Sequence, residues 1–352
     1  AIRDSSTSRG LGDVYKRQLY KFTLFNLIMK NQIKSLLSRP EISALVITIF
    51  LIIVCTFLSD RFLNTRNFMV ILAAYPEYAL VALGVTILMI SGEFDLSVGS
   101  VFAVAPIVTV ILVNDGYNQY WAVTLGLLSA ASLGLVNAIV TLFFKIPSFI
   151  TTLGMLFMAR SIAIGICGGF PPSFPKGWET DWLVGRIDMI RMSLFWLIGI
   201  TLVLHFILKK TNFGSWIFAT GENRQAANDL GINTIAVKTT CFVLCSTLAG
   251  FAGIIQSLRI KTAITSLGIG LELQAISAAV VGGASLFGGI GSAFGALVGT
   301  FLLALIDNIL ILTRVDGNWF KFGIGAMIII AVILNTYTKK KADNIRLKED
   351  DE

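Results

Sequence analysis

The sequence predicts an all-α polytopic membrane protein with about ten transmembrane helices. Hydrophobic residues make up 55% of its 352 residues, and the mean hydropathy is +0.79. Charged residues make up only 14%, where soluble domains carry about 25%. A globule of this composition lacks the polar side chains needed to cover its surface, which excludes soluble, disordered and collagen-like classes. The apolar residues also gather in runs long enough to cross a bilayer.

These runs define the predicted spans in order along the chain. A hydrocarbon core of about 30 Å requires about 20 apolar residues of helix. Ten runs meet or approach this length, namely 42–58, 68–90, 96–113, 121–144, 149–168, 192–208, 239–258, 271–281, 292–313 and 318–337. The eighth is the weakest, because a short apolar run is followed at once by Gly282 and Gly283. The segment 271–291 therefore either spans the bilayer or re-enters it.

Lys and Arg residues are divided unequally between the loops on the two sides. With ten spans, both termini share one side with the turn at Lys145 and the loop 209–238. That side carries 18 Lys and Arg, the opposite side carries nine, and Arg160 lies within a span. Positively charged loops face the cytoplasm in multi-pass proteins, so both termini are expected to be cytoplasmic. The net charge of +7 then reflects topology rather than binding to nucleic acid.

The rest of the chain divides into three segments around the transmembrane domain at 42–337. Residues 1–18 have no signal-peptide core and no regular period, which is typical of a non-native cloning leader. Residues 19–41 form a cytoplasmic N-terminal segment, and residues 338–352 form a charged cytoplasmic tail. All four Cys lie in apolar runs without a CxxC pair, and His205 is the single His. The sequence therefore predicts no disulfide and no metal site.

The segment SGEFDLSVGS at 91–100 interrupts the apolar sequence between the second and third spans. It combines glycines, carboxylates and a serine that disfavour a continuous helix, namely Gly92, Glu93, Asp95, Ser97 and Gly99. The helix that begins after this break has free N–H groups, and Asp95 is well placed to cap them. Two interpretations stay open: a tight cytoplasmic turn, or a discontinuous helix whose end lines the translocation pathway.

A second glycine-rich segment, VVGGASLFGGIGSAFG at 280–295, is similar to the first. Both have small residues after an apolar run, then a Leu-Ser or Ser-Leu step, then Gly-Ser before the next apolar run. This similarity suggests an internal two-fold repeat. The alternative is close helix packing through small residues, in which the glycines allow backbones to approach. The glycines concerned are Gly282, Gly283, Gly288 and Gly291.

The loop 209–238 contains a short predicted helix at 221–230. Thr220 is a plausible N-cap, Glu222 favours the positive helix end, and Gly231 is a plausible C-terminal stop. Its apolar positions are small, which makes the helix unsuited to lie in a membrane interface. A short helix of this kind fits a groove on a partner protein. The other interpretation is a connecting helix packed on its own chain. Its candidate contact residues are Gly221, Glu222, Asn223, Ala226, Ala227 and Gly231.

Four ionisable residues lie within predicted spans: Glu77, Arg160, Glu272 and Asp307. An ionised side chain facing lipid at the centre of the membrane costs about 2.5–3.5 kcal/mol, so these residues should face the bundle or water. They are candidates for the translocation pathway. Structural roles compete, because Asp307 can pair through the adjacent Asn308 and Glu77 directly follows Pro76.

Taken together, the motifs resemble the integral permeases of bacterial ABC importers for ribose, xylose, galactose and related small solutes, including the autoinducer-2 type. The resemblance covers about 41–337. It rests on GEFDLSVGS at 92–100, KIPSFITTLG at 145–154, FATGENRQAANDLGI at 218–232 and GLELQAISAAVVGGASLFGGIGSAFGALVG at 270–299, in this order and spacing.

The resemblance implies a set of partners: two cytoplasmic ABC ATPase subunits, a second permease chain, same or related, and an extracytoplasmic solute-binding protein. In such permeases a cytoplasmic coupling helix carries EAA followed three residues later by Gly; here Gln225 stands at the acidic position. The chain has no Gly-Lys dipeptide and so no P-loop, which places ATP and Mg²⁺ in the partner subunits. No cofactor or nucleic acid is expected on this chain, which is surrounded by lipid of the cytoplasmic (inner) membrane.

Three other classes compete with an ABC permease. An ion-coupled secondary transporter also has broken helices, and Glu77 and Asp307 would suit it. An intramembrane enzyme lacks support, because no HExxH or GxSxG motif occurs and no nucleophile lies beside a base. A structural scaffold would not need the capped cytoplasmic helix. The sequence leaves the substrate open among ribose, other pentoses, deoxyhexoses, galactosides and autoinducer-2. The external loop 171–185 contains Trp178 and Trp182. These residues are sugar contacts, anchors at the membrane interface, or part of a landing surface for the binding protein.

Overall fold

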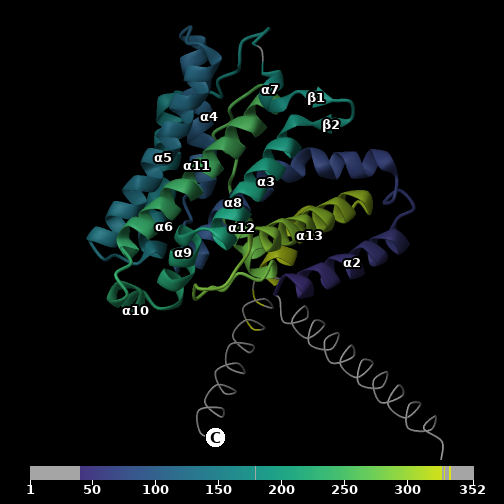
Figure 1. The fold of residues 1–352 in the computed structure, drawn as a ribbon. Helices are drawn as coiled ribbons and strands as arrows, with labels where there is room; N and C mark the ends of the chain where they lie inside the picture. The colour runs from purple at the N-terminus through teal and green to yellow at the C-terminus, as the bar shows by residue number, and fades with distance from the viewer. Residues whose placement is uncertain (1–39, 179, 327–328, 330–332, 334–352) are drawn as a thin grey trace, which may run out of the picture.

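The computed structural model describes residues 40–178, 180–326, 329 and 333 (Figure 1). Its elements are α2 Pro40–Leu58, α3 Thr65–Ile90, α4 Val98–Asn114, α5 Gln119–Phe143, α6 Ser148–Ile166, α7 Asp181–Val184, β1 Arg186–Ile187, β2 Ile190–Arg191, α8 Met192–Lys210, α9 Asn212–Glu222, α10 Arg224–Asp229, α11 Thr234–Ile260, α12 Leu271–Val281 and α13 Ala293–Leu312. The two short strands pair in an antiparallel hairpin.

Helices occupy nine of the ten predicted apolar runs, and the tenth is helical over 318–326, where the continuous description ends. Six of the described helices are long and apolar enough to cross a membrane: α3, α5, α6, α8, α11 and α13. The chain is therefore helical and suited to a bilayer, as its composition predicts. The predicted leader at 1–18, most of the segment 19–41 and the tail at 338–352 lie outside the described residues.

The helix α11 lies at the centre of the bundle and packs against α3, α4 and α5. Small residues allow these close contacts. A Cβ added at Gly253 of α11 would collide with the carbonyl oxygen of Phe102 in α4, and one at Gly84 of α3 would lie 3.0 Å from the Cα of Cys245. Close backbone approach through small residues is the usual basis of helix packing in lipid, where the hydrophobic effect does not drive association.

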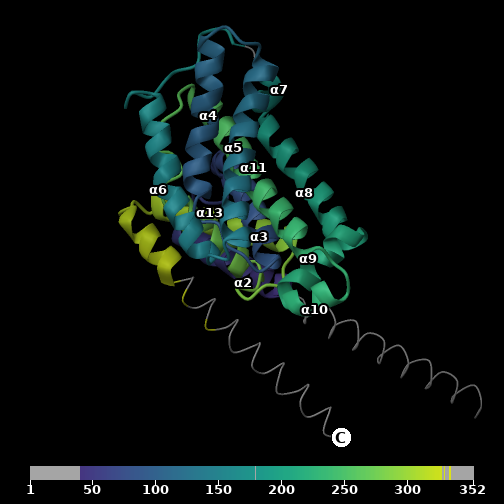
Figure 2. The ribbon, with the colours of Figure 1, turned by 90° about the vertical axis from the view of Figure 1, so that its left-hand side faces the viewer.

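Large apolar side chains face outward from the peripheral helices. Phe57 of α2, Phe157 of α6 and Phe206 of α8 have exposed fractions of 86%, 64% and 60%. Such surfaces are typical of helices in contact with lipid, since the bilayer interior is as apolar as a protein core. Figure 2 shows α4, α5, α6 and α11 side by side, with α8 beyond them.

The two longest predicted loops lie at opposite ends of the bundle. Figure 1 shows α7, β1 and β2 at the top and α10 at the bottom, with α9 beside it. The predicted external loop and the predicted cytoplasmic loop are thus separated along the helix axes.

Candidate functional site

The loop 209–238 forms two helices where the sequence predicts one. The predicted start at Gly221 is wrong: Gly221 and Glu222 complete α9, and α10 begins after Asn223. Asn223 adopts an extended backbone conformation, with φ −151°, and its side chain accepts a hydrogen bond from the N–H of Ala226 at 3.1 Å. Asn223 is therefore the N-cap of α10, because an extended backbone with a side-chain acceptor is the usual way to begin a helix. Thr220 lies buried within α9.

The end of α10 follows the predicted pattern. Gly231 has a φ of 81°, and its N–H bonds to the carbonyl oxygen of Asn228 at 2.9 Å. The N–H of Ile232 bonds to the carbonyl oxygen of Ala227 at 3.0 Å. This pair of hydrogen bonds is the Schellman motif, in which glycine provides the left-handed residue.

The two alanines of α10 face in different directions. Ala227 is buried against its own chain, whereas Ala226 is exposed. The predicted display of both to a partner is therefore wrong for Ala227, and the interpretation as a helix packed on its own chain holds for that residue. The exposed surface of α10 contains Gln225, hydrogen-bonded to Asp229 at 3.1 Å, and ends at Leu230, which is 80% exposed.

Both glycine-rich turns meet at the end of α9. The N–H of Gly289 donates to the carbonyl oxygen of Ile90 at 2.9 Å, which joins the second turn to the first. Gly221 lies against both turns, because a Cβ added there would collide with that same carbonyl oxygen and lie 2.7 Å from the nitrogen of Gly289. At Gly288 an added Cβ would lie 3.0 Å from the Cα of Gly92. Gly92 and Gly288 also have φ values of 84° and 83°, which favour glycine.

A buried ion pair attaches the first glycine-rich turn, which contains Glu93, to α11. The ammonium Nζ of Lys238 lies 2.6 Å from Oε1 of Glu93, and both side chains are largely buried. Lys238 is in the second turn of α11, just after α10. The α9–α10 segment is thus held to the first glycine-rich turn on both sides, by the backbone contact at Gly221 and by this ion pair.

Asp95 lies at the centre of a buried polar cluster. Its carboxylate accepts hydrogen bonds from the N–H and the hydroxyl of Ser97, at 2.7 and 2.6 Å. Asn137 of α5 donates to the Ser97 hydroxyl at 2.9 Å, and Ser246 of α11 approaches the carboxylate at 3.4 Å. Since Ser97 is the residue before α4, Asp95 closes the turn ahead of the helix rather than capping its first-turn N–H groups.

The chain between Asp95 and α4 runs beside α6. The N–H of Leu96 donates to the hydroxyl of Thr152, and the hydroxyl of Ser100 donates to the carbonyl oxygen of Leu156. The first contact satisfies a backbone N–H of the helix break, and the second joins the first turn of α4 to α6. The break is therefore held against α6.

Arg160 of α6 joins two breaks in helix continuity. Its guanidinium donates to the carbonyl oxygens of Gly99 and Leu267, both at 2.8 Å, and to that of Thr265. At Gly99 an added Cβ would collide with the carbonyl oxygen of Gly268 and with Glu272. Arg160 is thus bound to the start of α4 and to the loop before α12.

The remaining glycines of the second turn pack against neighbouring backbone. Gly282 and Gly295 face each other, and a Cβ added at either would collide with the carbonyl oxygen of the other. Gly283 has a φ of 95° in the turn after α12. A Cβ at Gly291 would lie 2.7 Å from the Ile90 side chain. Both interpretations of this segment, helix packing and a pair of similar turns, are compatible with these contacts.

Glu77 is fully buried and lies 3.2 Å from the Nε of Arg259 at the end of α11. The ion pair explains how a carboxylate is accommodated in the middle of α3, since a buried charge requires a partner. Glu77 therefore faces the bundle, as its cost in lipid predicts.

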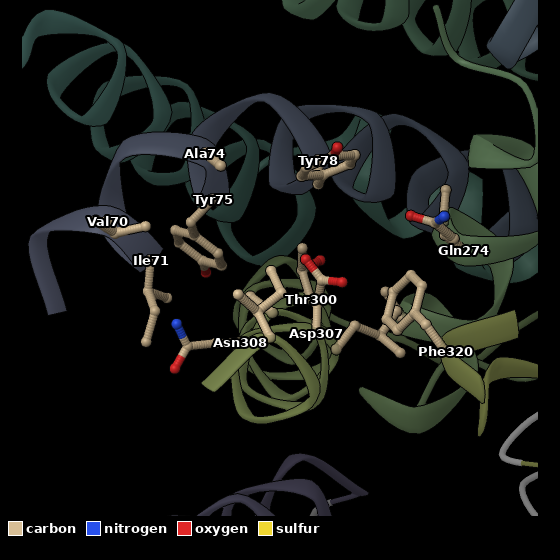
Figure 3. Close-up of a pocket in the computed structure, with 15 residues that line it drawn as sticks. Val70, Ile71, Ala74, Tyr75, Tyr78, Gln274, Thr300, Asp307, Asn308 and Phe320 are labelled. Carbon is tan, nitrogen blue, oxygen red and sulfur yellow. The ribbon is translucent and has the colours of Figure 1, made fainter. Parts of the chain in front are cut away.

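Asp307 and Asn308 line a cavity of about 300 Å³ between α3, α12 and α13 (Figure 3). Asn308 is buried and exchanges hydrogen bonds of 3.0 and 2.8 Å with the side chain of Asn67 in α3. Asp307 is exposed. Among the ionisable candidates, Arg160 interacts electrostatically with Glu272, and Glu77 and Asp307 both interact electrostatically with Tyr78.

Several partners of the predicted residues lie outside the predicted set. In the predicted topology Lys238 and Arg259 belong to loops, Asn137 and Gln274 lie within spans, and Asn67 lies just before one. The presence of Asn137 and Gln274 in apolar runs is a signal, because polar side chains in spans need partners. In the part of the chain that the structure describes, no group of three His, Cys, Asp or Glu side chains is placed to hold a metal.

A known family and several known proteins match most of this chain. Residues 67–332 match the family model described as branched-chain amino acid transport system, permease component. The Autoinducer 2 import system permease protein LsrC of Shigella flexneri is 31% identical over 313 residues, 86% of this chain and 88% of that protein. The LsrC protein of Escherichia coli K12 / DH10B is 30% identical over the same shares.

An archaeal relative has a different stated solute. The Xylose/arabinose import permease protein XylH of Sulfolobus acidocaldarius is 28% identical over 322 residues, 89% of this chain and 90% of that protein. No solved structure matches the chain. The family model matches most of the chain, and the Shigella flexneri LsrC is 31% identical over 86% of it. The chain therefore belongs to the family described as branched-chain amino acid transport system, permease component.

Proposed function

We propose that this chain is the transmembrane permease of an ABC importer that carries a small sugar or sugar-like solute into the cytoplasm. It is a multi-pass protein of the cytoplasmic membrane. The relatives named for autoinducer 2 and for xylose and arabinose, matched over nearly their whole length, support a sugar-like solute rather than an amino acid. The chain itself acts as a transport subunit, and ATP with Mg²⁺ is bound by partner ATPases.

The observation that carries the mechanism is the junction at Gly221. The end of α9 contacts the turn between α3 and α4 and the turn between α12 and α13, and those turns are hydrogen-bonded to each other. A displacement of α9 and α10 therefore acts on both broken helix pairs together. Closure of two ATPase subunits would push α10, and the junction would transmit this movement to the spans, which alternate between outward-open and inward-open states.

The exposed end of α10 is the proposed contact with the ATPase. Leu230 is 80% exposed beside Gln225 and Ala226, so an apolar side chain is displayed at the tip of a short, capped helix. A helix that presents a small apolar contact suits a groove on a partner. The buried Ala227 holds this helix on its own chain.

The proposed topology has ten spans with both termini in the cytoplasm and a second permease chain, the same or related, beside this one. The helix α12 has eleven residues and is about 16 Å long, which is half of a core of about 30 Å. Before it, Ala263 bonds to Pro172 near the proposed external end, and after it, Gly289 bonds to Ile90 near α9. These contacts support the proposal that the segment 271–291 belongs to one discontinuous span rather than a re-entrant loop. The two similar turns support an internal two-fold repeat.

The solute-binding protein is expected to dock at the end formed by α7, β1 and β2. Aromatic side chains gather there: Trp178 stacks on Phe174 with ring centroids 5.2 Å apart, and Trp182 contacts Tyr120 and Trp196. The aromatic rings pack on one another, which favours a rigid landing surface over direct contact with sugar.

The test is a substitution at the exposed tip of α10. We expect Leu230→Arg to reduce co-purification of the ATPase, and ATP hydrolysis stimulated by the loaded binding protein, by at least about tenfold. Leu230→Met keeps an apolar side chain of similar volume and should retain both. If Leu230→Arg still binds the ATPase and imports solute at the normal rate, the assignment of α10 as the coupling helix is wrong.

A further inference from the structure

A cavity lined by several polar side chains lies between α3, α12 and α13 (Figure 3). Asp307 points from α13 toward Tyr78 on α3, with Gln274 of α12 and Phe320 at one end of the cavity. We propose that this cavity is a binding site for an uncharged, polyhydroxylated solute of monosaccharide size. The proposal rests on the import function and assigns the solute a place within this chain.

Half of the polar groups of the cavity are not used to hold the fold. Among the described residues, the carboxylate of Asp307 has no ion pair or hydrogen bond, and neither the amide of Gln274 nor the hydroxyl of Tyr78 has a hydrogen-bond partner. In contrast, Asn308 is bound to Asn67 and the hydroxyl of Tyr75 donates to the carbonyl oxygen of Leu297. Part of the polar lining is therefore structural, and the rest is available to a ligand.

The position of Asp307 argues against lipid as the neighbour of this cavity. It lies five residues before the end of α13, a helix whose other polar side chains are Thr300 and Asn308, and it is exposed. A carboxylate in contact with acyl chains is unfavourable, so side chains of this kind in spans face water, a partner group or a substrate. Contact with acyl chains is therefore unfavourable at this face, and the proposal assigns it to water and polar solute.

The lining also indicates which solute would fit. A carboxylate, an amide and a phenol supply acceptors and donors for several hydroxyl groups, and Phe320 and Tyr75 supply apolar surface for the carbon ring. The volume of about 300 Å³ is at the lower limit of the range for small-molecule sites, which suits a small solute. An anionic solute such as a sugar phosphate would be repelled by Asp307, because the nearby cation Arg259 is already paired with Glu77.

Thiol labelling tests whether the cavity is open to water and holds a sugar. Gln274→Cys would be treated, in membrane vesicles, with a cationic methanethiosulfonate reagent, with and without D-xylose, L-arabinose or D-ribose. The control is Ala279→Cys on the same helix, which is fully buried away from the cavity. We expect labelling at 274 that at least one sugar slows, and none at 279. Absence of labelling at 274, or labelling that none of the sugars slows, would overturn the site.

Transport measurements separate the site from the coupling mechanism. In proteoliposomes containing the complex that co-purifies with this chain, Asp307→Asn should lower solute imported per ATP hydrolysed by about tenfold, because hydrogen bonds to a charged carboxylate become weaker bonds to a neutral amide. The matched control, Asp316→Asn, changes a carboxylate outside the cavity. If Asp307→Asn imports as much solute per ATP as wild type, the site is wrong although the import function stands. If the wild-type complex hydrolyses no ATP and imports no sugar, the import function fails, and the labelling experiment still decides whether the cavity binds a sugar.

Discussion

Replacing Gly221 by alanine has two opposing effects on stability, one from helix propensity and one from a tertiary contact. Gly221 lies in the last turn of α9 with an ordinary helical backbone, so helix propensity alone predicts that alanine stabilises the protein by about 0.5–1 kcal/mol. The contacts predict the reverse. The added methyl group would collide with the carbonyl oxygen of Ile90 and lie 2.7 Å from the nitrogen of Gly289.

The expected magnitude follows from the kind of atoms in contact. Overpacking costs about 1–3 kcal/mol when side chains can move. Here the contacted atoms belong to the backbone of both glycine-rich turns, so the cost lies at the upper end, and the net loss should be about 2 kcal/mol after the propensity gain. Relief requires α9 to move away from the turns, which would also weaken the proposed coupling.

The assay compares Gly221→Ala with a control in which the same methyl group meets nothing. A Cβ added at Gly154 in α6 would have no neighbouring atom within 4 Å, so Gly154→Ala should be neutral or slightly stabilising. The measurements are the temperature at which half of the detergent-solubilised protein leaves the monodisperse peak, and ATP hydrolysed per solute imported. If Gly221→Ala matches wild type in both, the contact at the end of α9 does not carry the role assigned to it.

Substitutions in three further sets of contacts test how the helix breaks are held. Lys238→Met should lower the free energy of unfolding by about 3 kcal/mol, because it leaves Glu93 buried without a partner. Adding Glu93→Gln should restore most of this loss in a double-mutant cycle measured by thermal stability. Additive losses would contradict the pairing. Arg160→Lys should cost about 2 kcal/mol or more, since one ammonium cannot replace a guanidinium bound to three carbonyl oxygens, and an unchanged unfolding temperature would argue against that role. Asp95→Ala should destabilise the protein by about 3 kcal/mol and Asp95→Asn by less, because the asparagine amide keeps an acceptor for Ser97 and alanine does not. Equal effects of the two variants in the same thermal assay would refute the role of Asp95 as this acceptor.

The residues of α10 illustrate how far local patterns reach. The stop at Gly231 was predictable, because a glycine after a short helix is a local signal and the hydrogen bonds it closes are local. The start was not, because Thr220 and Asn223 are both good N-cap residues and the sequence does not choose between them. The choice is made by Gly221, which must remain in α9 to pack against Ile90.

The candidate pathway residues show what local patterns cannot predict. The cost of a charge in lipid was enough to predict that Glu77 faces the bundle. It was not enough to predict Arg259 as its partner, 182 residues away, or the bonds from Arg160 to the carbonyl oxygens of Gly99 and Leu267. Such pairs depend on which faces of two helices meet, and the apolar runs carry almost no period from which those faces can be read.

Local patterns in the chain were sufficient to establish a helical membrane protein, the positions of its apolar helices and the points where helix continuity breaks, because hydropathy and glycine act within a few residues of themselves. Helix packing alone brought the two similar glycine-rich turns together at Gly221, paired Lys238 with Glu93, and placed Tyr78, Gln274 and Asp307 in one cavity. These arrangements join segments far apart in the chain, and they depend on how whole helices fit against one another, which no local pattern specifies.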